Sequence, residues 1–402
     1  MNVSSIRQDF PLLRKDKPVV YFDSACQSLR PQQVIDALVE YYSEYPACGG
    51  RSTHRLADRV TKEVEKARET VRKFIKAAKK EEIVFTRNTT EGINLIAHSL
   101  GLQKGDVVIS SDKEHNSDLI PWQVLVEQVG IEHIIVPSRE NNTFDLAAFE
   151  HILQKQKSVK LVAMCFTSNL DSNTIPAAEI IKLSHKKGAL VLLDGAVTIA
   201  HQPIDVRKLD VDFLVFSGHK ICGPSGIGVL YGKQKLLEKL SPFMVGGDTV
   251  AWSTYTTHEF LPVPEKFEAG LQDYAGIIGL GKALEYVEKI GLDNIAKHEK
   301  ELTVYMAELL GQIPNMHIIG PDAKERGSIT SFYIPGIDSH QIALMLSESA
   351  NIMVRSGQHC VHSWFAKRNI KGSVRISLSF YNTKEEIEYF GKQLKKVVSV
   401  LG

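Results

Sequence analysis

The sequence has little cysteine and no long hydrophobic run. Its 402 residues include five cysteines, an odd number without a Cys-x-x-Cys pair, so neither a disulfide framework nor a structural zinc site is expected. The most apolar segment, "GALVLLDGAV", is far shorter than the roughly 20 residues of a membrane span. The first residues, "MNVSSIRQDFPLLRKDKP", contain no apolar signal core, so we expect a cytoplasmic protein with free thiols.

The chain also lacks an excess of charge of one sign. It has 48 Lys plus Arg against 47 Asp plus Glu, a net charge of +1, which does not favour nucleic acid as a partner. There is no Pro- or Gly-rich linker and no internal repeat. The length exceeds the roughly 250–300 residues at which single cores stop growing, so we expect two domains that share an interface.

Short apolar runs alternate with amphipathic stretches between about residues 60 and 290. The runs are "EIVFT", "DVVIS", "HIIVPS", "VKLVAMCF", "ALVLLDG", "DFLVFSG" and "IGVLYG". Continuous apolar strands separated by helices predict a mostly parallel α/β sheet that is covered on both faces. In such sheets ligands bind beyond the carboxyl ends of the strands.

The pattern changes near residue 290, where a long charged helical stretch precedes further short strands. A final helix is predicted to start at the capping box formed by Thr383 and Glu386 in "TKEE". We therefore predict a large domain at residues 19–289 and a smaller α/β domain at 290–402. The segment 1–18 is expected to pack on the smaller domain.

Two charged residues follow the ends of apolar runs, and one ligand requires both. Asp194 ends "LVLLD", and Lys220 follows "FLVFSGH" and precedes "GPSGIG". A carboxylate at the end of a buried strand is costly unless it meets a cation or a donor. Pyridoxal phosphate forms an imine with a lysine, and its ring nitrogen needs a carboxylate partner. For an isolated lysine, a surface position at a strand end is the simpler interpretation.

The same cofactor needs a phosphate site and a ring that stacks on its pyridine. In "FTRNTTEGINLIAHSL" a strand leads through Thr89 and Thr90 into a helical pattern, and a helix amino terminus with hydroxyl groups suits a dianion. A simple Thr helix cap would give the same pattern. His115, in "DKEHNSDLIPW", follows the "DVVIS" strand and could stack on the ring.

Taken together, these features resemble the fold-type-I pyridoxal-phosphate enzymes of aminotransferase class V. Within that class the chain resembles the cysteine desulfurases, in the SufS-like group that includes selenocysteine lyases, over nearly its whole length. The motifs that carry the resemblance are "TRNTTEGIN", "EHN" before "PW", "TSN", "LLDGA", "FLVFSGHK", "GPSGIGVLYG", "FEAG" and "RSGQHC". The resemblance implies a large domain built on a mostly parallel seven-stranded sheet, a smaller C-terminal α/β domain and a homodimer.

The resemblance also implies roles for individual residues. Lys220 would bind the cofactor aldehyde and act as a catalytic base, Asp194 would pair with the ring nitrogen, and His115 would stack on the ring and move protons. Phosphate ligands would be Thr89, Thr90, Ser217 and His219. Substrate ligands would be Asn169, which also contacts the cofactor, Arg355 and Arg375. Cys360, in "RSGQHC", would be the nucleophile, with Arg355, His359 and His362 as positive neighbours that favour a thiolate.

The implied reaction converts L-cysteine to L-alanine and leaves a persulfide on Cys360, which is passed to an acceptor protein for iron–sulfur cluster assembly or thiolation. The alternatives are a related C–S or C–Se lyase, such as a selenocysteine lyase acting on L-selenocysteine, or a class V aminotransferase. A non-catalytic scaffold that kept the fold is a third alternative. No metal, nucleic acid or membrane is expected to take part.

Three positions depart from the family pattern. Val197 stands where the family has a Gln that bonds the cofactor's phenolic oxygen, and Leu271 stands where a Thr reaches the phosphate of the neighbouring subunit. The residues 170–173, "LDSN", replace a small Gly-containing turn. Arg51 and His54 resemble a segment that reaches into that subunit. The remaining thiols Cys26, Cys48 and Cys222 are expected to serve packing or an interface.

Overall fold

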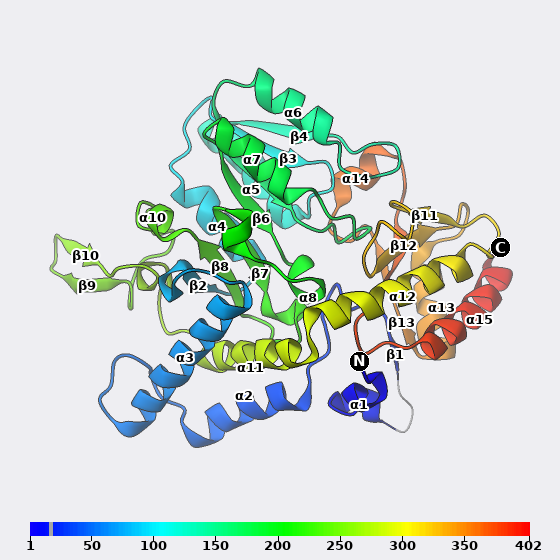
Figure 1. The fold of residues 1–402 in the computed structure, drawn as a ribbon, viewed down its shortest axis with the longest axis horizontal. Helices are drawn as coiled ribbons and strands as arrows, with labels where there is room; N and C mark the ends of the chain where they lie inside the picture. The colour runs from blue at the N-terminus through cyan, green and yellow to red at the C-terminus, as the bar shows by residue number, and fades with distance from the viewer. Residues whose placement is uncertain (16–18) are drawn as a thin grey trace.

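The largest element of the computed structural model, which describes residues 1–15 and 19–402, is a seven-stranded sheet (Figure 1). Its strands, in the spatial order β2-β8-β7-β6-β5-β3-β4, are β2 (Ile83–Thr86), β8 (Gly228–Gly232), β7 (Phe213–Ser217), β6 (Leu190–Asp194), β5 (Val159–Cys165), β3 (Val107–Ser111) and β4 (Glu132–Val136). Within this sheet β8 alone runs opposite to the other six strands. The predicted mostly parallel α/β fold is confirmed, and each of the seven apolar runs forms one strand.

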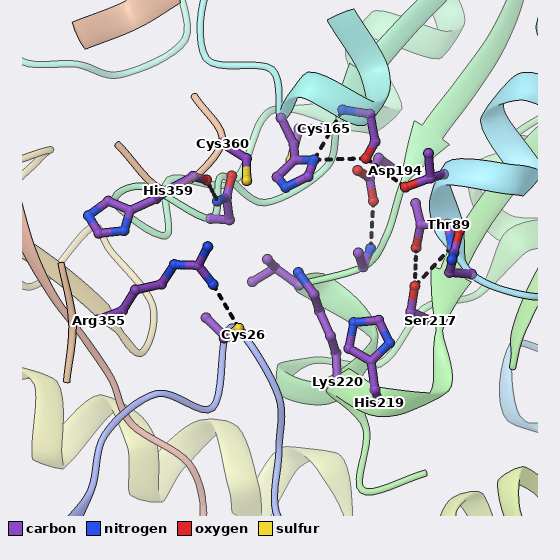
Figure 2. Close-up of a pocket in the computed structure, with 18 of the residues that line it drawn as sticks. Cys26, Thr89, Cys165, Asp194, Ser217, His219, Lys220, Arg355, His359 and Cys360 are labelled. Atoms are coloured by element: carbon purple, nitrogen blue, oxygen red, sulfur yellow. Dashed lines mark hydrogen bonds between the residues drawn. The ribbon is translucent and has the colours of Figure 1, made fainter. Parts of the chain in front are cut away.

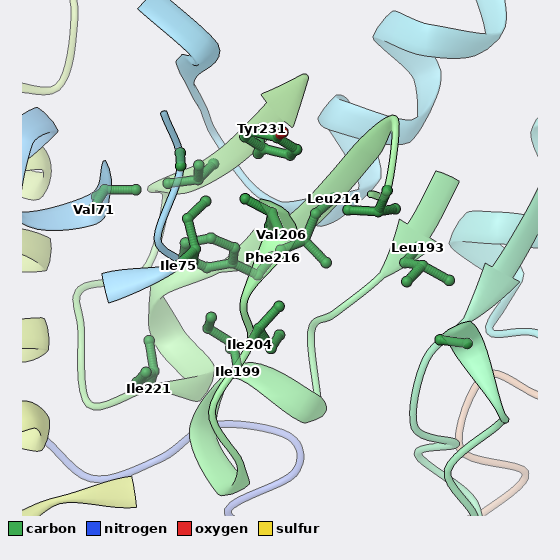
Figure 3. Close-up of a cluster of buried hydrophobic side chains, with 14 of the residues drawn as sticks. Val71, Ile75, Leu193, Ile199, Ile204, Val206, Leu214, Phe216, Ile221 and Tyr231 are labelled. Carbon is green, nitrogen blue, oxygen red and sulfur yellow. The ribbon is translucent and has the colours of Figure 1, made fainter. Parts of the chain in front are cut away.

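The strands are apolar on both faces because both faces are covered. In β7, Leu214 and Phe216 belong to one hydrophobic cluster, whereas Phe213 and Val215 belong to the cluster on the opposite face. Figure 3 shows part of the first cluster, in which Leu214 and Phe216 lie near Val206. Side chains of a strand alternate between faces, so a strand buried on both sides shows no polar alternation in sequence.

Helices form a layer on each face of this sheet. One face is covered by α4 (Thr89–Ser99) and α5 (Asn116–Val129). The other carries α3 (Arg55–Phe74), α6 (Leu146–Lys155), α7 (Ala177–Lys186), α9 (Val206–Leu209) and α11 (Tyr274–Ile290). Shorter or peripheral helices are α2 (Gln32–Glu44), α8 (Thr198–His201) and α10 (Gln234–Leu237). No helix within the described ranges is long and apolar enough to cross a membrane.

A second, antiparallel sheet forms in the last third of the chain. Its spatial order is β11 (His317–Ile319), β12 (Ile329–Tyr333), β15 (Ser373–Ser377) and β14 (Arg355–Gly357). The helices of this part are α12 (Leu292–Leu310), α13 (Ser339–Ala350), α14 (His362–Lys367) and α15 (Lys384–Leu401). It has its own core, which includes Phe332 and Phe390. The Thr383 and Glu386 capping box at the start of α15 is confirmed.

The N-terminal segment packs against this second part. Arg7 of α1 (Val3–Arg7) pairs with Glu386 at 2.8 Å, and the ring of Phe10 lies 4.9 Å from that of Tyr381. The strand β1 (Val20–Tyr21) pairs in parallel with β13 (Ile352–Met353). Residues 16–18 of the predicted packing segment lie outside the described residues. A hairpin of β9 (Val250–Ser253) and β10 (His258–Phe260) projects from the opposite side of the molecule (Figure 1).

Candidate active site

The carboxyl ends of the parallel strands meet a cavity of about 220 Å³. Asp194 ends β6, Ser217 ends β7, and the loops after β2, β3 and β5 reach the same edge. The structure brings every candidate site residue to the walls of this cavity: Thr89, Thr90, His115, Asn169, Asp194, Ser217, His219, Lys220, Arg355, Cys360 and Arg375. Parallel strands bring residues distant in sequence together in this way because their carboxyl ends share one edge of the sheet.

Asp194 ends β6, and Lys220 lies in the short 3-10 helix η3 (Gly218–Lys220) that follows the neighbouring strand β7 (Figure 2). Asp194 is buried and accepts a 2.9 Å hydrogen bond from the Ala196 amide on one carboxylate oxygen. Burial raises the pKa of Asp194, while the Ala196 amide and the Lys220 charge act in the opposite direction. Burial lowers the pKa of Lys220, and Asp194 opposes that shift. A lowered pKa brings the amine closer to its neutral, nucleophilic form.

The amino terminus of α4 forms a site suited to a phosphate. The Thr89 amide donates to Ser217 Oγ at 2.9 Å, and the two hydroxyl oxygens are 2.7 Å apart. The strand β8 passes so close that a Cβ on Gly228 would lie 2.7 Å from Asn88 Cα, so this position requires glycine. His219 lies on the same wall, and burial lowers its pKa to about 4. His219 is therefore neutral at pH 7 and can donate a hydrogen bond without adding charge.

His115 is held by a short polar chain. Its Nδ1 accepts the Ser117 amide at 3.1 Å, and Ser117 Oγ lies 3.0 Å from the same atom and 2.7 Å from Thr90 Oγ1. Burial, followed by the charges of Lys220 and Arg375, lowers the pKa of His115 to about 3. The ring is therefore neutral with its proton on Nε2, because Nδ1 acts as an acceptor. The sequence interpretation missed Ser117, although its position two residues after His115 could have indicated it.

Two arginines stand side by side on the opposite wall. Arg355 of β14 and Arg375 of β15 are directly paired in register, which places their side chains on the same face of the small sheet. Arg375 is buried; its Nη1 donates to the Asn169 carbonyl at 3.1 Å and its Nη2 contacts Asp23 at 3.2 Å. Arg355 makes no ion pair with any described residue and instead donates to Cys26 Sγ at 2.7 Å. Like charges placed opposite each other favour binding of an anion between them.

Polar atoms on this wall lack partners within the described residues. They are Asn169 Oδ1, His359 Nδ1 and Arg375 Nε, and all three side chains are almost completely buried. Asn169 uses its amide nitrogen to donate to the His359 carbonyl at 2.8 Å. Buried polar atoms without a partner are uncommon in folded proteins, so these atoms indicate a place for a ligand.

Cys360 lies in the loop between β14 and α14. Both His359 and Cys360 have positive φ angles, 51° and 61°, and the Cys360 carbonyl accepts the Asn116 amide at 2.7 Å. The positive neighbours expected from sequence are only partly present. Burial lowers the pKa of His359 to about 2, so that ring is neutral, and Arg355 contacts Cys26 rather than Cys360.

The prediction that Cys26 serves packing or an interface is wrong. Cys26 lines the same cavity as Lys220 and Cys360, and Figure 2 shows it next to Arg355. Cys222 is buried in the core, as expected, and Cys48 is half-buried outside the cavity. The motif "DSACQSL" gave no signal for a site, because the contact with Arg355 joins residues 329 positions apart.

The departures from the family pattern also have places in the structure. Val197 is buried and lines the cavity with an apolar side chain, and Leu271 is 65% exposed. Asp171 is completely buried and pairs with Lys113 at 2.8 Å. This ion pair joins the loop that carries Asn169 to the loop that carries His115. The residues 170–173, which replace the family's turn, are therefore held by a buried ion pair.

The residues present fit pyridoxal phosphate. An amine with a lowered pKa, a buried carboxylate and a helix amino terminus with hydroxyl groups lie on one cavity wall, and they match the aldehyde, the ring nitrogen and the phosphate. Among the described residues there is no group of three or more His, Cys, Asp and Glu side chains arranged to hold a metal ion.

Comparisons with known proteins agree with this chemistry. The aminotransferase class-V family profile matches residues 20–390. A cysteine desulfurase of Synechococcus elongatus is 41% identical over 98% of this chain, which spans 64% of that relative's length. A probable cysteine desulfurase of Synechocystis is also 41% identical over 98% of this chain and is covered to 95%.

Solved structures give the same result. The cysteine desulfurase of Thermococcus onnurineus, in its apo form, superimposes with a TM-score of 0.94 at 36% identity, over 99% of this chain and 98% of that one. The chain therefore belongs to the aminotransferase class-V family of fold-type-I pyridoxal-phosphate enzymes, among the cysteine desulfurases.

Proposed function

We propose that this chain converts L-cysteine to L-alanine and holds the released sulfur as a persulfide on Cys360. The observation that supports this proposal is a cavity that Lys220, Cys360 and the paired arginines Arg355 and Arg375 all line. An amino acid bound there can present its carboxylate to the arginines, its amino group to the lysine side and its sulfur to a thiol.

The proposed cofactor contacts follow from the walls of the cavity. Lys220 would bind the aldehyde of pyridoxal phosphate, Asp194 the ring nitrogen, and Thr89, Thr90, Ser217 and His219 the phosphate. His115 would lie on the ring, and Asn169 would reach the phenolic oxygen. When bound, the cofactor supplies an electron sink that delocalises the negative charge left on the substrate after proton loss. Val197 cannot donate a hydrogen bond, so one of the family's contacts to the phenolic oxygen is missing.

The chain's own residues account for the remaining chemistry. Arg355 and Arg375 bind the substrate carboxylate, for which planar guanidinium groups are well suited. Lys220, whose pKa is lowered by burial, takes the Cα proton. The Cys360 thiolate then attacks the substrate sulfur: an S–S bond forms, the Cβ–S bond breaks, and the carbon product takes up a proton. In sum, L-cysteine and the Cys360 thiol give L-alanine and a persulfide.

The test is mass spectrometry of the Cys360 peptide after brief exposure of the loaded protein to L-cysteine, with alanine counted in parallel. We expect a gain of about one sulfur atom on Cys360 and an equal amount of alanine. Pyruvate with free sulfide, or an exchanged amino group, would contradict the proposal and would indicate a lyase or an aminotransferase. Protein that does not take up the cofactor would indicate a scaffold.

One observation favours a second candidate, a selenocysteine or other C–S lyase. Val197 gives the cavity an apolar surface where the family has an amide, and this changes how the cofactor's phenolic oxygen is held. Turnover of L-cysteine by the Cys360→Ser variant separates the two functions. A lyase that needs no thiol would keep this activity, and the proposed desulfurase would lose it.

We also infer that the protein is a cytoplasmic homodimer that passes its sulfur to an acceptor protein in iron–sulfur cluster assembly or thiolation. Large apolar side chains exposed at the periphery support a dimer; they include Tyr42 of α2, Trp252 of β9 and Leu271. The segment with Arg51 and His54 would reach the partner's site. All five cysteines are free, which suits a reducing compartment. Light scattering on a sizing column measures the mass that tests the dimer.

A further inference from the structure

Cys26 is a second thiol in the proposed active site. It lies in the loop between β1 and α2, whereas Cys360 lies in the loop between β14 and α14, and both side chains are half-buried on the walls of the same cavity. In Figure 2 the end of the Arg355 side chain lies between Cys360, above it, and Cys26, below it. The cavity that they share has a volume of about 220 Å³.

The surroundings of Cys26 differ from those of the other thiols. Arg355 donates a hydrogen bond to its Sγ at 2.7 Å, so Cys26 has a guanidinium group as its direct neighbour. Burial raises the pKa of both Cys165 and Cys222, which keeps those thiols protonated. Cys48 is half-buried but does not line the cavity.

The pairing of the two arginines explains why a sulfur occupies this place. Arg355 and Arg375 face each other across adjacent strands, and burial, with the charge of Arg355 as a smaller cause, lowers the pKa of Arg375. Asp23 partly compensates Arg375. Among residues 1–15 and 19–402 no carboxylate forms a close ion pair with Arg355, whose charge acts on Asp23 at longer range, and Cys26 Sγ is the acceptor that Arg355 contacts. The unpartnered Asn169 Oδ1 and Arg375 Nε on the same wall show independently that this side of the cavity is built for a ligand.

We propose that Cys26 is a second sulfur-accepting residue, which takes the terminal sulfur from the Cys360 persulfide; this inference rests on the proposed function. The Cys26 thiolate attacks the terminal sulfur of Cys360–S–SH. A bond forms between Cys26 Sγ and that sulfur, and the bond to Cys360 Sγ breaks. The electron pair leaves with Cys360 Sγ, which takes up the proton that Cys26 lost. No oxidant is needed, because the step starts from one thiol and one persulfide and ends with one persulfide, on Cys26, and one thiol, on Cys360.

The persulfide itself shortens the gap between the two residues. Its S–S bond of about 2.05 Å extends the reactive sulfur from Cys360 beyond the reach of the thiol. After the transfer, Cys360 is again a free thiol and can accept sulfur from a second L-cysteine. The active site would then hold two sulfur atoms per chain before any acceptor arrives, one on Cys26 and one on Cys360.

The experiment uses full-length protein loaded with pyridoxal phosphate and exposed to L-cysteine without a reductant or an acceptor. Sulfur is located by alkylation and peptide mass spectrometry, and alanine formed in the initial burst is counted. We expect sulfur on both Cys26 and Cys360 and about twice as much burst alanine as in Cys26→Ser, which labels Cys360 alone. Serine keeps an oxygen acceptor for Arg355, and Cys48→Ser, which removes a half-buried thiol outside the cavity, should match the parent protein.

The outcomes separate this inference from the proposed function. Sulfur on Cys360 but never on Cys26, including a Cys360 that carries two sulfur atoms, would overturn the transfer and leave the proposed function intact. Sulfur on Cys26 in the Cys360→Ser variant would overturn it too, because the transfer requires Cys360. If Cys360 carries no sulfur in any variant, the proposed function fails and the transfer fails with it.

Discussion

The two walls of the cavity are built differently. The Lys220 wall consists of strand ends and the amino terminus of α4, and its hydroxyl groups are already bonded to each other, as between Thr89 and Ser217. The Cys360 wall comes from the small sheet and two loops, has two residues with positive φ, and leaves Asn169 Oδ1 and Arg375 Nε without described partners. A site on rigid elements with satisfied hydroxyl groups suits a resident cofactor, whereas buried polar atoms without a described partner suit a substrate that comes and goes.

The largest expected effect tests the Lys220 wall. Lys220→Ala should lower alanine formation from L-cysteine by about 10⁴-fold, because it removes both the covalent anchor and the base. The visible absorbance of lysine-bound cofactor should also disappear, while the thermal midpoint stays close to that of the parent. Lys235→Ala, at an exposed lysine of α10, is the control. Activity within tenfold of the parent protein would show that Lys220 is not the anchor.

The next effect tests whether the walls act separately. Cys360→Ser should lower alanine formation by roughly a hundredfold or more, since an alcohol does not replace a thiolate as the sulfur acceptor. The cofactor spectrum should be unchanged, because the Lys220 wall remains intact. A variant that makes alanine from L-cysteine at the parental rate would remove Cys360 from the mechanism, and a lost cofactor spectrum would show that the two walls are not independent.

A smaller effect concerns substrate recognition. Arg375→Lys keeps the charge but loses the planar fork, and loss of one charged hydrogen bond of about 1.5–3 kcal/mol should raise KM about 10- to 100-fold. The effect on kcat should be smaller, and cofactor binding should not change. Steady-state kinetics with L-cysteine give both values. Arg355→Lys is the matched comparison, and an unchanged KM in both variants would contradict the carboxylate role.

The smallest effect concerns the loss of folding stability at acidic pH, to which histidines on both walls contribute. Burial lowers the pKa of His115, His219 and His359 in the cavity, and it lowers that of His133, in β4, to about 4. Because the folded-state pKa lies below the unfolded value of 6.5, protons bind more readily to the unfolded chain. The free energy of unfolding should therefore fall as pH drops from 6.5 towards 4.

His133→Gln checks the sign of this effect outside the cavity. It should flatten the loss of stability between pH 6.5 and 4 by at most about 1.4 kcal/mol per pH unit, as measured by urea unfolding at several pH values. Activity at pH 7.5 serves as the control and should match that of the parent protein. A steeper loss of stability in the variant would show that His133 is not held neutral by burial.

The sequence predicted the Lys220 wall better than the Cys360 wall. Asp194, Ser217 and Lys220 follow apolar runs, and a parallel sheet places the ends of such runs together. The Cys360 wall depends on how the second sheet and the N-terminal loop are placed against the first, which no local pattern records. For that reason Cys26 was assigned to packing, and the positive neighbours of Cys360 were only partly correct.

The sequence by itself determined the strands, the helices between them and the order of the chemical groups along the chain, because hydrophobic periodicity and strand-end residues are local properties. Only the tertiary structure decided that Arg355 contacts Cys26, that Asp171 pairs with Lys113, and that His359 is neutral. These facts depend on burial and on contacts between residues far apart in sequence, and both arise only when the two sheets and the N-terminal segment pack together.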